Sequence, residues 1–386
     1  MADQGDVWAS PSGSAGDEPP RYGERIPGWQ PPPPTATAPV APQPGTGYVP
    51  PPRPGLIPLH PLSFGQLLGS AFAVLRWNPR ATVLPTLVIN VVQSALTYGL
   101  VYGVGISAVD RISRASAADR GAILAGTAAE GVLTGLLLLA VSVIGNALLQ
   151  GLIVHVVARG ALGERPTLGE AFRRAARSFW PLLGYALLLG AAQLVAIVAL
   201  ALLVVGVAAT GTVGVLLAVL LGLVGGAAYA VAYCFLLVKL ATVPSAIVLE
   251  GLGIRAAIAR SWVLLRGAFW RSLGLILLVF VIVWFAGQVV SLPFSLLGGA
   301  LGGLVFPNGG TPTSGDDIAS MLPTILLTSL PATVVTVIVG AIGQIAQLAS
   351  LSLIYLDRRI RSEGLDLELQ RYVELGGPDP LEPAKR

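Results

Sequence analysis

Charged residues are scarce in this chain. Only 11% of its 386 residues are Asp, Glu, Lys or Arg, whereas 54% are hydrophobic. Soluble domains carry about 25% charged residues, so a soluble fold of this size could not cover itself with polar surface. The deficit excludes an ordinary soluble globular protein and indicates that a lipid bilayer solvates much of the chain.

Cysteine and histidine are almost absent as well. Cys234 is the single cysteine and lies inside an apolar run, so no intrachain disulfide can form. The two histidines, His60 and His155, are far apart in the sequence, and neither an HxxxH nor a CxxC spacing occurs. The glycine-rich stretch at 298–303 lacks the lysine of a phosphate-binding loop. We therefore predict no metal site, no cofactor and no catalytic residues, and we expect a protein that is not an enzyme.

Residues 1–61 have little aliphatic content and hold 17 of the 30 prolines. Such a segment cannot offset the entropy lost on ordering, so we predict a disordered, proline-rich cytoplasmic tail. Its PxxP spacings (Pro31/Pro34 and Pro39/Pro42) fit a protein partner that binds proline-rich segments, whereas a solvated spacer is the simpler interpretation. The N-terminus lacks a basic-then-apolar start, so we expect the later apolar runs to act as their own insertion signals.

Six apolar runs follow the tail, each long enough to cross a bilayer as a helix, which takes roughly 20 residues. None alternates like a barrel strand, and backbone polar groups need internal partners in lipid, so the spans should be helical. The predicted fold class is all-α, a polytopic membrane helical bundle at 62–356 with a cytoplasmic C-terminal tail at 357–386. The predicted spans are 81–106, 131–157, 181–207, 212–238, 272–296 and 332–356.

Lysine and arginine are unevenly distributed between alternate connections of these spans. Of the 24 basic residues, 21 lie on one side, and only Arg111, Arg114 and Arg120 lie on the other. Basic connections are retained in the cytoplasm. We therefore expect a multi-pass protein of a bacterial plasma (inner) membrane with both termini cytoplasmic. The connection at 297–330 has no basic residue and should lie outside.

Three segments that precede outward-running spans combine arginine with aromatic residues, at 63–80, 167–181 and 253–272. The first two open with the pattern of a capping box, Ser63 with Gln66 and Thr167 with Glu170. On a helical wheel the arginines of 253–272 oppose its apolar face, which is typical of a helix lying in the membrane interface. We predict three interfacial amphipathic helices whose lipid-contacting residues are Arg76, Trp77, Arg173, Arg174, Arg177, Trp180, Arg255, Arg260, Trp262, Arg266, Phe269, Trp270 and Arg271.

The order of interfacial helix, outward span and inward span occurs three times, which predicts three parallel repeats related by a pseudo-threefold axis. The simpler alternative is that any cytoplasmic loop entering a span tends to be basic and aromatic. The basic residues lie at span ends, where anionic lipid headgroups are the nearest ligands, so we predict membrane lipid and not nucleic acid as the partner.

Amide side chains occur in every predicted span except the fourth. They predict either hydrogen bonds between helices or a polar path through the membrane. No charged residue lies in the middle of a span, which argues against proton- or sodium-coupled transport. The amides are Asn90, Gln93, Asn146, Gln150, Gln193, Gln288, Gln344 and Gln347.

Four stretches carry a family resemblance: PGLIPLHPL at 54–62, AFAVLRWNPRAT at 71–82, LATVPSAIVLEGLGIRAAIARSWVLLRGAFWRSLG at 240–274 and IYLDRRIRSEGLDLELQ at 354–370. They resemble an actinobacterial integral membrane family labelled "glycerophosphoryl diester phosphodiesterase membrane domain". In the proteins behind that label, a similar membrane region precedes a separate catalytic barrel, which would need about 250 soluble residues. We expect no such barrel in this chain, so the resemblance implies the membrane bundle and not the reaction.

Three functions of different classes follow from these observations. The first is a non-enzymatic integral membrane protein that engages anionic lipid or a membrane partner. The second is a transporter or exporter of a lipid-like or small polar solute, indicated by the amides and the expected repeats. The third is a membrane anchor for a separately encoded catalytic partner. The C-terminal stretch, where leucines alternate with acidic residues at 365–369, either docks under the bundle or frays.

Overall fold

The structure is a computed structural model that describes residues 55–58, 60–116, 118–305, 315–375 and 381. The chain divides into two units, Met1–Pro51 and Pro52–Arg386, and every described residue belongs to the second. The predicted proline-rich tail therefore lies outside the described residues up to residue 54, and so do both PxxP spacings.

The described residues form helices and no strand. Every predicted span lies within one long helix, and within the described residues six helices are long and apolar enough to cross a membrane, which confirms the all-α six-span class. The long helices are α2 (Pro79–Ser113), α3 (Arg120–Ala161), α5 (Phe179–Ala208), α6 (Thr212–Lys239), α9 (Phe269–Val305) and α10 (Gly315–Glu363). The short helices are α1 (Phe64–Trp77), α4 (Leu168–Arg177), α7 (Val243–Glu250), α8 (Ile254–Leu264) and α11 (Leu365–Leu375).

Local sequence signals explain where several of these helices begin and end. Both predicted capping boxes are confirmed: Ser63 and Gln66 cap α1, and Thr167 and Glu170 cap α4. The turn between α5 and α6 contains Gly211 at a φ of 112°, a conformation that favours glycine.

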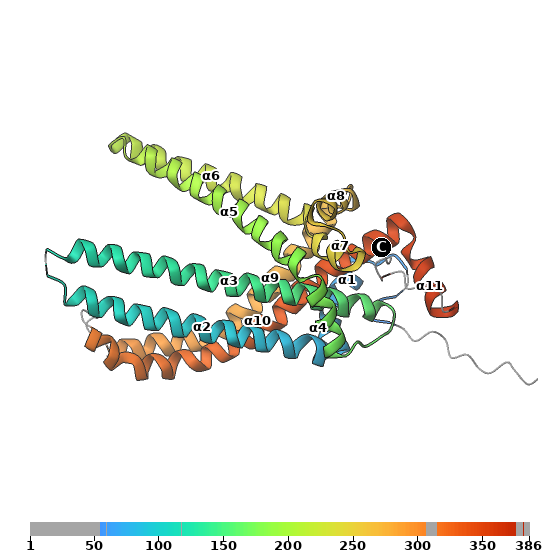
Figure 1. The fold of residues 1–386 in the computed structure, drawn as a ribbon, viewed down its shortest axis with the longest axis horizontal. Coiled ribbons are helices and arrows are strands. Elements are labelled where there is room, and N and C mark those ends of the chain that lie inside the picture. Colours follow the sequence, from blue (N-terminus) through green and yellow to red (C-terminus); the bar gives the residue numbers. More distant parts are fainter. Residues whose placement is uncertain (1–54, 59, 117, 306–314, 376–380, 382–386) are drawn as a thin grey trace, which may run out of the picture. The chain divides into compact units, whose positions relative to one another are not determined.

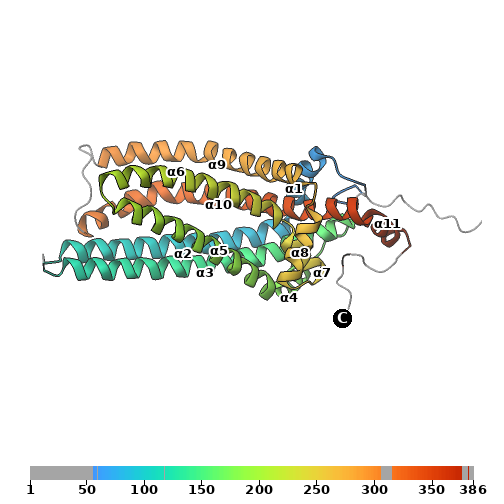
Figure 2. The same cartoon turned by 90° about the horizontal axis from the view of Figure 1, so that it is seen from above.

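The long helices contact one another in an order that closes on itself (Figures 1 and 2). Along the chain α2 contacts α3, α3 contacts α5, α5 contacts α6, α6 contacts α9 and α9 contacts α10, which returns to α2. The short helices gather at one end of the spans. The element order is that of the expected repeat, a short helix followed by two spans, with α7 as an extra helix in the third unit.

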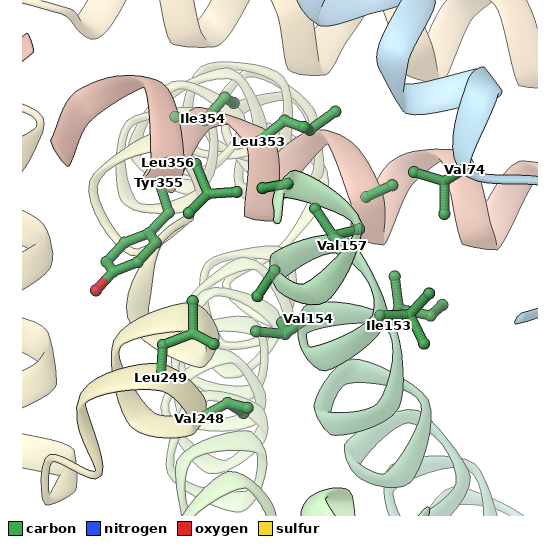
Figure 3. Close-up of a cluster of buried hydrophobic side chains, with 14 of the residues drawn as sticks. Val74, Ile153, Val154, Val157, Val248, Leu249, Leu353, Ile354, Tyr355 and Leu356 are labelled. Carbon is green, nitrogen blue, oxygen red and sulfur yellow. The ribbon is translucent and has the colours of Figure 1, made fainter. Parts of the chain in front are cut away.

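The buried apolar core lies at the end of the bundle where the short helices gather (Figure 3). Side chains from α1, α3, α7 and α10 converge there, including Val74, Ile153, Val154, Val157, Val248, Leu249, Leu353, Ile354, Tyr355 and Leu356. Elsewhere the spans leave large apolar side chains uncovered, such as Val195 on α5 (68% exposed) and Leu223 on α6 (69% exposed). Because uncovered apolar surface on this scale needs lipid around it, the chain is a membrane-spanning helical protein.

Two predicted segments differ from the structure. The expected connection at 297–330 is largely helical, since α9 runs to Val305 and α10 begins at Gly315. Hydropathy reports where a helix crosses the apolar layer and not where it ends, which explains the error. The single interfacial helix predicted over 253–272 is interrupted: α8 ends at Leu264, and Gly267, at a φ of 73°, precedes α9. A glycine in this left-handed conformation ends a helix.

The segments flanking the bundle are packed against it. Leu56 donates its backbone N–H to the carbonyl of Gly160 over 2.7 Å, and Ile57 is 1% exposed, although both lie within the predicted tail. At the other end, α11 buries Leu365 and Leu369 completely. Of the two alternatives for the C-terminal stretch, the structure therefore shows docking, with i and i+4 leucines of a helix on the bundle.

Candidate functional site

A phenylalanine–tryptophan pair opens both α5 and α9 in the same geometry. The rings of Phe179 and Trp180 meet edge to face at 5.4 Å, and so do the rings of Phe269 and Trp270. Trp180 is 74% exposed and Trp270 is 80% exposed. Tryptophan is enriched where a span meets the headgroup layer, and each of these uncovered tryptophans lies at the start of a long apolar helix.

A third aromatic group lies between α6 and α8. The ring of Trp262 meets that of Phe235 at 5.9 Å, and the ammonium of Lys239 lies 5.2 Å from the Trp262 ring centre. The exposed arginines Arg255 and Arg266 flank this group along the sequence. Basic and aromatic side chains therefore occupy the ends of three spans on the side of the short helices.

Some predicted lipid-contacting arginines contact protein groups in the structure. Arg260 forms ion pairs with Glu250 at 3.1 Å and with Glu363 at 2.5 Å. Arg271 donates to the carbonyl of Leu62. Arg260 thereby ties α7 and the end of α10 together, and Arg271 ties the segment before α1 to Asp357 of α10. Of the predicted lipid-contacting arginines in the first and third basic segments, Arg76, Arg255 and Arg266 are exposed.

The most basic part of the site is a hollow of about 330 Å³ between α3 and α4, which we call the arginine pocket. Its lining contains five arginines and two glutamates, so three positive charges are in excess. Arg159 and the 7% exposed His155 come from adjacent turns of α3, and Arg173, Arg174 and Arg177 come from α4. Glu170 also comes from α4, and the remaining lining residues, Glu164, Arg165 and Pro166, belong to the connection between these helices.

Small residues bring the two helices of the arginine pocket close together. Gly151 on α3 faces Ala175 on α4, and a Cβ at position 151 would lie 3.1 Å from the Ala175 Cα. Ala171 and Ala175 are buried, whereas Phe172, Arg173 and Arg177 are exposed. The buried alanines therefore lie on the packed side of α4, and Arg173 and Arg177 lie on its exposed side.

The end of α1 holds the connection that lines the arginine pocket. Trp77 donates its ring N–H to the carbonyl of Glu164 over 3.2 Å, and the Arg165 guanidinium lies 4.9 Å from the Trp77 ring centre. Asn78 donates to the carbonyl of Pro166 over 2.8 Å. Trp77, predicted to contact lipid, is half-buried and positions this connection.

Both glutamates of the arginine pocket are bound to groups of the protein. Glu164 pairs with Arg159 at 3.1 Å and accepts from the Tyr372 hydroxyl at 3.2 Å. Glu170 accepts the backbone N–H of Thr167 at 2.9 Å, and this hydrogen bond is the largest cause that lowers the pKa of the Glu170 carboxyl. In the described part of the chain, Arg165, Arg173 and Arg177 have no ion-pair partner. The charge excess therefore resides on arginines that face the hollow.

Sequence reasoning found three of the six basic side chains that line this pocket. It nominated Arg173, Arg174 and Arg177 but not His155, Arg159 or Arg165. One signal was present: Arg159 follows His155 by four residues, so both share a face at the end of α3. The approach of α4 to that face depends on Gly151 and Ala175, which no local pattern reveals.

Three of the amides meet across three spans. The Asn90 side chain donates to Gln344 over 2.8 Å, and Gln344 donates to Asn146 over 2.8 Å, which joins α2, α10 and α3. Gln93 donates to the carbonyl of Val141 over 3.4 Å, between α2 and α3. These bonds realise the first alternative for the amides, hydrogen bonding between helices.

The other amides are not joined to this network by the described contacts. Gln150 keeps a buried Oε1 atom without a hydrogen-bond partner among the described residues. Gln193 and Gln347 are half-buried, and Gln288 is exposed on α9. The structure therefore does not connect the eight amides into one continuous path.

A family model described as a domain of unknown function, DUF7847, matches residues 62–351, which include the arginine pocket, the amide network and all the long helices except the end of α10. No curated protein and no solved structure matches the chain. The phosphodiesterase label carried by the resemblance finds no support in this match. The chain belongs to the family described as a domain of unknown function, DUF7847.

Proposed function

We propose that this membrane-spanning protein is a non-enzymatic module that engages anionic lipid at the end of the bundle where the short helices lie. The observation that carries the proposal is the pair of equivalent tryptophans at the starts of α5 and α9, Trp180 and Trp270. Both are largely uncovered by protein, and an exposed arginine precedes each by three or four residues, Arg177 before Trp180 and Arg266 before Trp270. Tryptophan and arginine together favour the headgroup layer.

The distribution of basic residues indicates which side of the membrane the short helices face. The exposed arginines Arg76, Arg255 and Arg266 and the arginine pocket all belong to connections that the positive-inside rule assigns to the cytoplasm. The cytoplasmic leaflet carries anionic lipid, and each basic residue near its surface contributes about 1 kcal/mol of attraction. We therefore place both termini and the arginine pocket on the cytoplasmic side of a bacterial plasma membrane.

Thermal unfolding of the full chain in a mild detergent, with added phosphatidylglycerol or phosphatidylcholine, tests this proposal. A ligand that binds the folded state raises the unfolding temperature. We expect phosphatidylglycerol to raise it more than phosphatidylcholine, and we expect 0.5 M salt to reduce the difference because exposed charges are screened. Equal shifts with both lipids, unchanged by salt, would overturn the proposal.

A pair of variants assigns the effect to the right end of the bundle. Arg255→Gln with Arg266→Gln should reduce the response to phosphatidylglycerol. Arg114 is also exposed, at 72% of its side chain, but it follows α2 at the end of the bundle away from the short helices. Arg114→Gln should therefore leave the response to phosphatidylglycerol unchanged. If both variants lose the response equally, the effect comes from net charge and not from this end of the bundle.

A further inference from the structure

The arginine pocket differs from the other basic positions of the molecule because its charges converge on one hollow. Exposed arginines such as Arg255 and Arg266 can each meet a separate lipid headgroup. In the arginine pocket, Arg165 from the connection and Arg173 and Arg177 from α4 line the same space. Converging guanidinium groups are suited to a single polyvalent anion, because each group presents N–H donors in a planar fork.

The charge of the lining indicates the valence of that anion. Glu164 and Glu170 are held by Arg159, Tyr372 and Thr167, and Arg165, Arg173 and Arg177 have no ion-pair partner within the described residues. A ligand with one negative charge would leave most of this excess uncompensated. A phosphate monoester or a diphosphate carries at least about 1.5 to 2 negative charges near neutral pH.

The size of the arginine pocket favours a substituted phosphate group over a simple ion. Its volume of about 330 Å³ is at the lower end of the range for small-molecule sites, roughly 300–1,000 Å³. The neighbouring Trp180 is 74% exposed at the start of α5, three residues after Arg177. Because exposed tryptophans at span starts favour the headgroup layer, we expect the arginine pocket to lie at headgroup depth.

We propose that the arginine pocket binds the phosphomonoester or diphosphate group of a membrane lipid in preference to phosphodiester headgroups. The inference rests on the proposed function because the ligand is a membrane lipid, and it adds the chemical class of that lipid and the site that binds it. Arg165, Arg173 and Arg177 contact the phosphate oxygens. Trp77 and Asn78 act as positioning residues, because they hold the connection that carries Arg165.

Native mass spectrometry of the full chain in detergent, titrated with defined lipids, tests the preference. The probes are phosphatidic acid, which has a phosphomonoester headgroup, and phosphatidylglycerol, which has a phosphodiester headgroup. We expect phosphatidic acid to bind at least about tenfold more tightly, as the gain of one charged hydrogen bond predicts. The Arg173→Gln/Arg177→Gln variant should bind both lipids alike. Both arginines are exposed, and an unchanged unfolding temperature without lipid verifies that the variant folds.

The Arg255→Gln/Arg266→Gln variant is the matched control, since it removes two exposed arginines that do not line the arginine pocket. It should weaken binding of phosphatidylglycerol and keep the preference for phosphatidic acid. Equal affinity of the native chain for the two lipids, with phosphatidylglycerol still favoured over phosphatidylcholine, overturns the inference and leaves the proposed function intact. Loss of any preference for anionic lipid overturns both.

Inorganic pyrophosphate separates a lipid ligand from a soluble one. If pyrophosphate competes with phosphatidic acid in the native chain and has no such effect in the Arg173→Gln/Arg177→Gln variant, the shared phosphate group is the recognised chemistry. If pyrophosphate binds in an arginine-dependent manner while phosphatidic acid does not bind, the pocket belongs to a soluble ligand, and the inference of a lipid fails.

Discussion

Leu62 donates its backbone N–H to the carboxylate of Asp357 over 3.0 Å, although 295 residues separate them along the chain. Both carboxylate oxygens of Asp357 also accept from the Arg361 guanidinium at 3.0 Å. Arg361 and Arg271 in turn donate to the carbonyl of Leu62. One buried acid therefore joins the start of α1, the start of α9 and the end of α10.

Replacing Asp357 with an amide of the same shape should weaken this junction of α1, α9 and α10. Asp357→Asn keeps an acceptor for Leu62 but removes the charge that Arg361 and Arg271 meet. Because Asp357 is 2% exposed, we expect a loss of about 1.5–3 kcal/mol, the value of a hydrogen bond to a charged group. Thermal or denaturant unfolding in detergent measures this loss, and Glu368→Gln, an exposed acid of α11, should have little effect.

The amide network predicts a contrast between two glutamines in neighbouring spans. Gln344→Leu removes the hydrogen bonds to Asn90 and Asn146 and should lower the free energy of unfolding by about 1 kcal/mol, since one such bond between membrane helices averages about 0.6 kcal/mol. Gln288→Leu changes an exposed side chain of α9 and should leave stability unchanged or raise it. Equal effects of the two substitutions in the same unfolding assay would contradict a packing role for Gln344.

Local sequence patterns predicted the features that neighbouring residues determine. The six spans follow from the length of the apolar runs, and the caps at Ser63 and Thr167 follow from a four-residue pattern. The break at Gly267 was missed because the helical wheel assumes one continuous helix. The junction of Leu62 with Asp357 and the arginine pocket depend on contacts between distant segments. The sequence alone therefore nominates Arg260 for lipid contact and omits Arg159, whereas the fold pairs Arg260 with Glu250 and places Arg159 in the arginine pocket.

The cap of α4 predicts a small dependence of stability on pH. The hydrogen bond from Thr167 lowers the pKa of the Glu170 carboxyl in the folded chain, so the ionised form is favoured by folding. This contribution is complete above the carboxyl's pKa in the unfolded chain and disappears as the pH falls through the lower, folded value. The Glu170→Gln variant should therefore unfold at a lower temperature than the native chain at pH 7, and the difference should vanish in acid. A difference that persists at the lowest pH would contradict the charge argument.

The proposed orientation predicts which single cysteines react from outside the cell. In a Cys234→Ser background, Thr210→Cys places a thiol at the exposed turn between α5 and α6, and Ser362→Cys places one near the exposed end of α10. A membrane-impermeant maleimide should label position 210 in intact cells and position 362 only after lysis. Labelling of position 362 in intact cells would show that the topology is the opposite one and that the arginine pocket does not face the cytoplasmic leaflet.

Two glycines near the arginine pocket should respond to the same substitution with opposite signs. Gly169 lies in α4 with open space where a methyl group would be added, so Gly169→Ala should stabilise the helix by about 0.5–1 kcal/mol. At Gly151 the new methyl group would meet the Cα of Ala175 at 3.1 Å and the Leu182 side chain at 3.3 Å. Because a backbone atom cannot give way easily, Gly151→Ala should lower stability, by about 1–3 kcal/mol if the core is overpacked.

The lipid-binding assay shows whether the contact of Gly151 with Ala175 also shapes the arginine pocket or only stabilises the fold. Moving α4 away from α3 separates Arg173 and Arg177 from Arg159, so Gly151→Ala should also reduce the preference for phosphatidic acid over phosphatidylglycerol. Gly169→Ala should preserve that preference, because it changes neither the packed face of α4 nor the lining of the arginine pocket. A Gly151→Ala protein that is less stable but keeps the full preference would show that the arginine pocket does not depend on the close approach of α3 and α4.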